Sequence, residues 1–83
     1  MTKLEEKLIE LGYRYAPFAD GEIQWFKYEY DYELSFILYD HKIVRYGIPV
    51  YFFINNQDRL KELVKAFNQL QLDLEVLKEY GKF

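Results

Sequence analysis

Apolar residues near the start of the chain repeat at the spacing of an amphipathic helix, with charged residues between them. Thr2 stands where an N-cap belongs, and Glu5 follows at the capping-box position. Gly12 supplies the left-handed residue that ends many helices. The pattern therefore predicts a helix over residues 3–11. Its apolar stripe consists of Leu4, Leu8 and Leu11.

The next segment alternates in the manner of strands, beginning with a short one at residues 13–19. Pro17 cannot donate a hydrogen bond to a neighbouring strand, so this strand is expected at an edge of the sheet. Asp20-Gly21 favours a tight hairpin turn, because glycine accepts a positive φ at little cost. The pattern indicates a hairpin at this point of the chain.

Residues 22–39 are too long for one ordinary strand, and Asp31 marks the expected reversal. A two-residue loop at Asp31-Tyr32 would mix aromatic and polar residues on both faces of the sheet. An odd-length loop with a bulge keeps one face apolar, and we predict that arrangement. A three-residue loop over residues 40–42 extends the same face into a third long strand. The predicted core face consists of Phe26, Tyr28, Leu34, Phe36, Leu38, Val44, Tyr46 and Ile48.

A final helix of about 24 residues is expected from an N-cap at Asn55 or Asn56, after a bend at residues 47–49 and a strand at 50–54. Two apolar stripes run along this helix, and the second is available for self-association if the sheet covers only the first. The alternative is that the heptad spacing of the first stripe only reflects packing along the sheet and a second helix. The first stripe consists of Leu60, Leu63, Phe67, Leu70, Leu74 and Leu77, and the second of Leu72, Val76 and Tyr80.

Taken together, these elements predict an α+β fold with one domain over residues 1–83. A short helix is followed by an antiparallel meander of three to four strands, the first of them short, and then by a long helix. Both helices are expected on one face of the sheet, which gives a two-layer sandwich.

Composition narrows the range of functions. The 83 residues carry a net charge of −3, which disfavours direct binding of nucleic acid. The chain contains no cysteine, and so no disulfide or thiolate chemistry. The first residues do not resemble a targeting peptide, and no apolar run is long enough to span a bilayer. We expect a cytoplasmic protein without a membrane partner.

The reactive side chains are too few for a recognisable catalytic unit. The single histidine, His41, lacks a second nitrogen or sulfur ligand for a metal. Ser35 falls in the middle of a predicted strand, about 20 Å from His41 along the chain, so the two do not form a hydrolytic pair. The carboxylates lie mostly on solvated helix faces. We expect neither an enzyme nor a bound cofactor, and a deep pocket gathering carboxylates around His41 would be needed to overturn that expectation.

The face opposite the predicted core face mixes acidic and apolar residues and contains the only tryptophan of the chain. Tryptophan and tyrosine are frequent in interface hot spots, which makes this face a candidate for partner binding. Alternatively, its apolar residues form a cross-strand cluster that only stiffens the sheet. The candidate partner-binding residues are Trp25, Lys27, Glu29, Asp31, Glu33, Ile37, Tyr39 and Ile43.

Two helical segments, LEEKLIELGY at 4–13 and AFNQLQLDLEVLKEY at 66–80, resemble small uncharacterised proteins of phages and prophages of Gram-positive bacteria. The resemblance implies a compact product that acts inside a bacterium by binding a host protein, as anti-CRISPR and other anti-defence proteins do. Some inhibitors of that kind present acids in place of DNA phosphates. The residues available for such mimicry are Glu22, Glu29, Asp31, Glu33 and Asp40.

Two hypotheses follow from the sequence. The first is a non-enzymatic binding protein that engages a bacterial protein, such as a nucleic-acid-handling or defence enzyme, through the acidic and aromatic sheet face. The second is a homo-oligomeric scaffold protein, in its simplest form a homodimer, that associates through its final helix.

Overall fold

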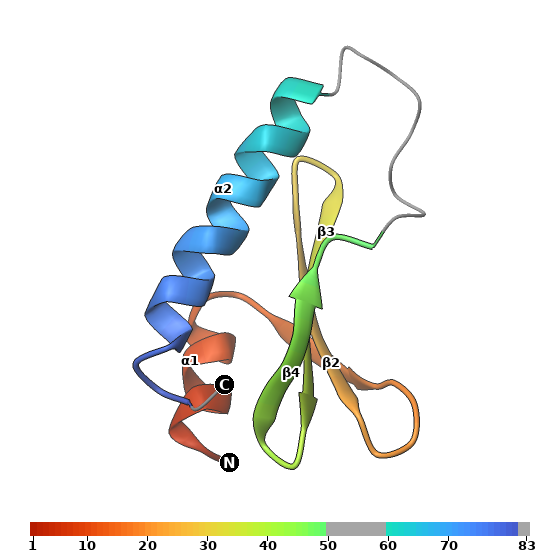
Figure 1. The fold of residues 1–83 in the computed structure, drawn as a ribbon, viewed down its shortest axis with the longest axis vertical. Helices are drawn as coiled ribbons and strands as arrows, with labels where there is room; N and C mark the ends of the chain where they lie inside the picture. Colours follow the sequence, from red (N-terminus) through yellow and green to blue (C-terminus); the bar gives the residue numbers. More distant parts are fainter. Residues whose placement is uncertain (50–59, 82–83) are drawn as a thin grey trace.

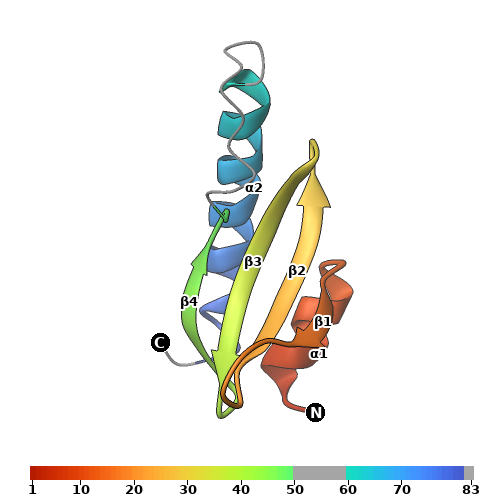
Figure 2. The same cartoon turned by 90° about the vertical axis from the view of Figure 1, so that its right-hand side faces the viewer.

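The computed structural model describes residues 1–49 and 60–81. The strands form one antiparallel sheet in the order β1-β2-β3-β4, so each lies beside its neighbours in sequence (Figure 1). Figure 2 looks onto one face of the sheet, with both helices behind it. The predicted α+β meander with both helices on one face is thus confirmed. The elements are α1 (Lys3–Glu10), β1 (Arg14–Pro17), β2 (Ile23–Glu29), β3 (Tyr32–Tyr39), β4 (Lys42–Gly47) and α2 (Leu60–Leu77).

The local signals at the start of the chain act as expected. The Thr2 hydroxyl accepts a hydrogen bond from the Glu5 backbone N–H at 3.2 Å, and the Thr2 backbone N–H donates to the Glu5 carboxylate at 2.9 Å. This capping box fixes the first turn of α1. The helix ends at Glu10, one residue before the predicted end, and Gly12 follows with a φ of 97°.

The first hairpin also follows its sequence signal. Pro17 is the last residue of β1 and pairs with Ile23 across the turn. Asp20 and Gly21 have φ angles of 47° and 83°, as a primed turn requires. β1 lies at an edge of the sheet, where the missing N–H of proline does no harm.

The two remaining hairpins overturn the predicted loop lengths. Glu29 pairs directly with Tyr32, and Tyr39 with Lys42, so each loop has two residues rather than an odd number. All four loop residues have positive φ, between 52° and 66°. Primed two-residue turns match the twist of the flanking strands, and aspartate and histidine tolerate a positive φ better than most residues do. The loops are Tyr30-Asp31 and Asp40-His41.

This register reverses the faces of β2. Trp25 pairs with Phe36 and lies beneath the helices, whereas Phe26 pairs with Ser35 on the open face. The prediction that Phe26 and Tyr28 belong to the core was therefore wrong. It was right for three residues of β3, namely Leu34, Phe36 and Leu38, all of which are buried.

A bulge in β4 also changes which residues of this strand face the helices. Ile37 pairs with Arg45 and Leu38 with Ile43, which leaves Val44 without a cross-strand partner. Ile43 consequently faces the core, and the predicted core residue Val44 is exposed. Beyond the bulge, Tyr46 stacks against Phe36 on the helix side with ring centroids 6.0 Å apart, although it remains partly exposed.

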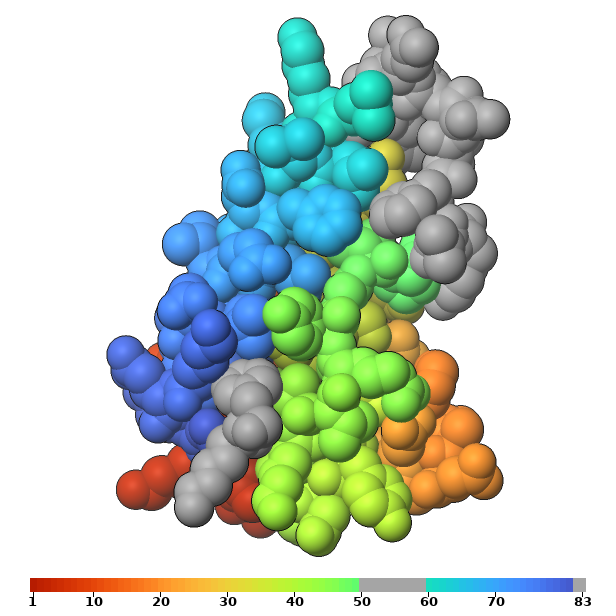
Figure 3. Space-filling model, viewed as in Figure 1, coloured from red at the N-terminus to blue at the C-terminus, as the bar shows by residue number. Residues whose placement is uncertain are grey.

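The helix α2 packs along the sheet with a stripe that differs in part from the predicted one. Ala66 and Asp73 are buried, whereas Leu60 and Phe67 are exposed. Figure 3 shows α2 beside β4 on the near side of the molecule. The expected N-cap at Asn55 or Asn56 and the expected strand at 50–54 lie outside the described residues. Buried apolar residues of the core are Leu4, Leu8, Tyr13, Trp25, Tyr32, Leu34, Phe36, Leu38, Ile43, Ala66, Leu70, Leu74 and Leu77, with Ile48 and Leu63 packed against them.

Candidate functional site

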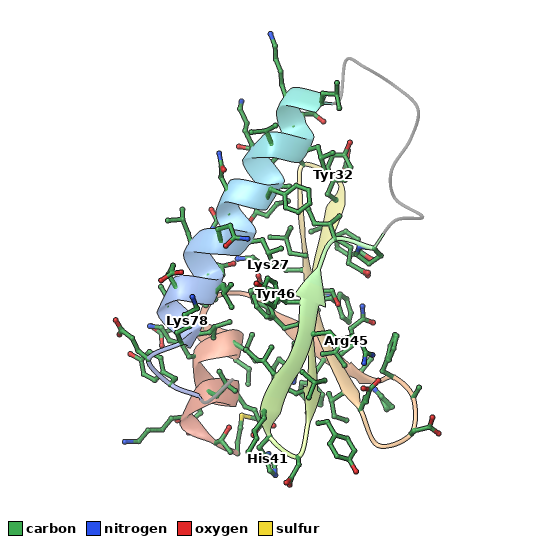
Figure 4. All side chains as sticks on the ribbon, viewed as in Figure 1. Lys27, Tyr32, His41, Arg45, Tyr46 and Lys78 are labelled. Atoms are coloured by element: carbon green, nitrogen blue, oxygen red, sulfur yellow. The ribbon has the colours of Figure 1, made fainter. Side chains whose placement is uncertain are left out.

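A charged cluster lies between the helices and the sheet, where an apolar core would be expected. Lys27 of β2 points toward α2 (Figure 4), and its Nζ lies 2.9 Å from Asp73 Oδ2 and 3.0 Å from the Leu11 carbonyl oxygen. Tyr13 donates to Asp73 Oδ2 at 2.7 Å, and Gln69 donates to Oδ1 at 3.0 Å. The cluster therefore joins α2, β2 and the segment after α1.

Burial governs the electrostatics of this cluster. Asp73 is only 2% exposed, yet its carboxylate accepts hydrogen bonds from several donors, which offset the cost of removing a charge from water. Burial, and then the hydrogen bond to Asp73, raises the pKa of the Tyr13 hydroxyl well above its ordinary value of 10.0. Lys27 Nζ also lies 4.7 Å from the centroid of the Tyr13 ring. These contacts hold α2 and the segment after α1 against the sheet.

The opposite face of the sheet carries a second, different polar cluster. Gln24 Nε2 donates to Glu33 Oε2 at 3.3 Å and to Ser35 Oγ at 3.1 Å, and Tyr28 donates to Glu33 Oε1 at 3.4 Å. Glu33 and Ser35 are each 6% exposed, and they lie on the face of the sheet that neither α1 nor α2 covers. Hydrogen bonds between neighbouring strands thus pair polar side chains of β2 and β3.

A pocket of about 460 Å³ opens beside this second cluster. Its floor follows from the register, because Ser35 lies opposite Gly47 and neither contributes a large side chain. A Cβ atom placed on Gly47 would meet no atom of residues 1–49 and 60–81 within 4 Å, so Gly47 leaves room at the floor of the pocket. The pocket is lined by Phe18, Gln24, Ser35, Ile37, Arg45, Tyr46, Gly47, Ile48 and Pro49.

Arg45 lies at the pocket and points away from the helices (Figure 4). Its Nη1 and Nη2 donate to the two carboxylate oxygens of Glu22 at 2.9 and 2.7 Å. These hydrogen bonds lower the pKa of Glu22 below its ordinary value. The charged groups at the pocket are therefore a compensated pair, and a wide, mostly apolar wall remains for a ligand.

The structure divides the predicted partner-binding residues between the two faces. Those expected to be open but found on the helix side are Trp25, Lys27, Glu29 and Ile43, and of these Trp25 is 1% exposed. Three others, Glu33, Ile37 and Tyr39, do lie on the open face, while Asp31 is in the β2–β3 turn. The single surface that was predicted does not exist.

The acids considered as phosphate mimics are also dispersed. Glu22 is paired with Arg45, Glu29 lies 3.9 Å from Lys27, and Glu33 is buried. Asp31 and Asp40 occupy turns at opposite ends of β3 (Figure 1). A row of acids with the spacing of a nucleic-acid backbone is not formed.

Sequence reasoning missed the pocket residues Phe18, Gln24 and Gly47. Their contribution depends on the two-residue turns and on the bulge at Val44, which set the face of each residue. The combination of Asp and His at the β3–β4 turn was the available signal, because both residues tolerate positive φ.

His41 lies in that turn, with its Nδ1 3.1 Å from Glu5 Oε1 of α1. Ser35 lies on the open face, so the two residues do not meet. Within residues 1–49 and 60–81, no three His, Cys, Asp or Glu side chains gather in a way that could hold a metal ion. Among the helices described there, none has the length and apolar character needed to cross a membrane.

The three residues proposed for self-association differ in their accessibility. Leu72 is 62% exposed, Tyr80 is partly exposed and Val76 is half-buried. Lys7 Nζ lies 5.5 Å from the centroid of the Tyr80 ring, which ties this tyrosine to α1. Leu72 is thus the most accessible apolar contact of the three.

Comparisons with known proteins do not identify the chain. No protein-family model matches it, and no significant match was found among curated proteins or solved structures.

Proposed function

We propose that this chain is a small, non-enzymatic, phage-type protein that binds a bacterial host protein through the open face of its sheet. The observation that carries the proposal is the pocket on that face, whose apolar walls surround a polar floor. Concave apolar sites with a few convergent polar groups are the usual form of a binding site.

Exposed aromatic residues extend the surface around the pocket. Phe18 lines the pocket, Tyr28 projects from β2 on the same face, and Tyr39 lies beside Arg45. All three are more than half exposed. Rigid aromatic side chains around a desolvated pocket are typical of interface hot spots.

The kind of partner is suggested by the resemblance of the two terminal segments to phage proteins. A product of that kind acts inside a bacterium, and the proposed partner is a nucleic-acid-handling or defence enzyme whose activity the complex inhibits. The proposed surface differs from the one expected from sequence, because it is aromatic and its acids are paired or buried.

The test is affinity capture from a bacterial lysate, with mass spectrometry of the bound proteins. A Phe18→Ala/Tyr39→Ala variant should lose the partner that the unaltered chain captures, because both changes remove exposed rings of the open face. Ile9→Ala is the matched control, since Ile9 is an exposed apolar residue of α1. Equal capture by the double variant and the control would contradict the proposal.

A second candidate function is homodimerisation through α2 to form a structural or scaffold unit. The high exposure of Leu72 favours it, since pairing two helices would cover this residue. Light scattering at high concentration should then give twice the monomer mass, and Leu72→Glu/Val76→Glu should return the mass to that of the monomer. A monomeric unaltered chain would exclude this candidate.

A further inference from the structure

We infer that the pocket on the open face accepts a neutral aromatic or aliphatic side chain from an extended segment of the protein partner. The inference rests on the proposed function for the partner being a protein. It adds the chemistry of the residue that enters the pocket, which follows from the shape, charges and free donors of the site.

The shape of the pocket suits a side chain inserted from above the sheet. Ser35 and Gly47 form a low floor, while Phe18 and Ile37 provide apolar walls. A volume of about 460 Å³ lies near the small end of the range for ligand sites, about 300–1,000 Å³. An inserted ring or branched chain would contact apolar atoms on several sides and displace water from them.

The charges at the site favour a neutral occupant. Arg45 forms a bidentate pair with Glu22, and the Glu33 carboxylate accepts from Gln24 and Tyr28. An incoming carboxylate would compete with the Glu22 carboxylate that Arg45 already binds, and an incoming ammonium would meet the Arg45 guanidinium. Either charged group would lose water without gaining an uncompensated partner.

The remaining donors of Arg45 explain why the occupant would belong to a peptide segment. A guanidinium has five N–H donors, and Glu22 accepts from both Nη1 and Nη2. Within residues 1–49 and 60–81, Arg45 makes no other side-chain hydrogen bond, and its side chain is 55% exposed. A backbone carbonyl next to the inserted side chain can accept a hydrogen bond from one of these N–H groups without adding charge.

The test is a two-dimensional NMR titration of the full chain with four small probes. Two are neutral, N-acetyl-phenylalaninamide and N-acetyl-leucinamide, and two are charged, phenylpropionate and phenethylamine. The neutral probes should shift the backbone signals of Ser35, Ile37 and Gly47, with affinity at least about tenfold higher than the charged probes. Equal affinity for all four, shifts elsewhere, or no shift with the neutral probes would overturn the inference.

Variants separate the pocket from the rest of the face. Phe18→Ala removes an exposed wall and should weaken the neutral probes at least about fivefold, whereas Ile9→Ala should leave them unchanged. Ser35→Leu should fill the floor and abolish binding; if that variant does not fold, Phe18→Ala decides alone. Undiminished binding by Phe18→Ala would count against the assignment.

The outcomes also separate this inference from the proposed function. Probe binding in the pocket without capture of any host protein would leave the inference standing and remove the proposed function. Capture of a partner that depends on Phe18 and Tyr39, without probe binding, would support the function and overturn the inference.

Discussion

The two faces of the sheet pair their buried polar groups in different ways. On the helix side, Lys27 and Asp73 form an ion pair enclosed between α2 and β2. On the open side, Gln24 and Ser35 satisfy one another and Glu33 through hydrogen bonds within the sheet. The first cluster holds separate elements together, whereas the second leaves a pocket next to it.

The difference indicates where function can reside. The helix-side cluster connects residues that are 60 positions apart, Tyr13 and Asp73, so disturbing it affects the whole fold. The open-side cluster and pocket lie on strands whose other face is already anchored. Residues such as Phe18 and Tyr39 can therefore serve binding with little cost to stability.

The largest expected effect tests which face is the core. Trp25→Ala should lower the free energy of unfolding by about 3–5 kcal/mol, because it empties a buried site and removes the ring packed 4.8 Å from Tyr15. Changing its half-buried neighbour Phe26 to alanine should lower the free energy of unfolding by less than about 1.5 kcal/mol. Chemical denaturation measures both values. A larger loss from Phe26→Ala would mean that the faces of β2 are assigned the wrong way round.

The second-largest effect tests the buried ion pair of Lys27 and Asp73. Asp73→Ala should destabilise the fold by about 3–5 kcal/mol, because it leaves the Lys27 ammonium buried without its carboxylate. The double change Lys27→Met/Asp73→Leu should recover most of that loss, since it removes both charges and keeps the volume. Denaturation curves of the two variants provide the comparison. A double variant as unstable as Asp73→Ala would show that the pair does more than compensate charge.

Sequence patterns predicted the parts of the fold that depend on neighbouring residues. Thr2 with Glu5, Pro17, and Asp20 with Gly21 each specify their own turn, cap or edge within a few positions. The face of β2 instead depends on long-range pairing. Lys27 is acceptable beneath the helices only because Asp73 lies there, and periodicity treats both residues as solvent-facing.

The candidate site was less accessible to sequence reasoning for a related reason. Ile37 and Tyr39 were assigned to the open face, and they lie there. The alternating pattern predicts that Trp25 lies there too, because an odd-length loop would separate the aromatic residues from the charged ones. The pocket arises from Ser35 facing Gly47 beyond a bulge, and no local pattern specifies that pairing.

The third effect concerns pH and the helix-side cluster alone. Because the pKa of Tyr13 is raised in the folded state, its contribution is complete below the unfolded value of 10.0 and is lost as pH rises above it. Between about pH 9 and about pH 11, unfolding free energy should fall more steeply in the unaltered chain than in Tyr13→Phe. Denaturation at a series of pH values measures the slopes. Parallel slopes would mean that burial and the hydrogen bond to Asp73 do not raise the pKa of Tyr13 in the folded state.

Glu22→Gln is expected to have the smallest effect on stability. Its main effect is expected on the ligand preference of the pocket on the open face. The Glu22–Arg45 pair is at the surface, so its loss should change the unfolding midpoint only slightly and less still at high salt. Its contribution is present above the ordinary carboxylate pKa of 4.5 and is lost as pH falls through the lowered pKa.

In the pocket, the same change leaves Arg45 without its carboxylate partner. The site should then prefer phenylpropionate over the neutral probes, which reverses the order expected for the unaltered chain. NMR titration of both proteins measures the two affinities, with Ile9→Ala as the control for general effects. An unchanged preference in Glu22→Gln would show that the neutrality of the pocket does not come from the Glu22–Arg45 pair, and the contrast between the two faces would then rest on shape alone.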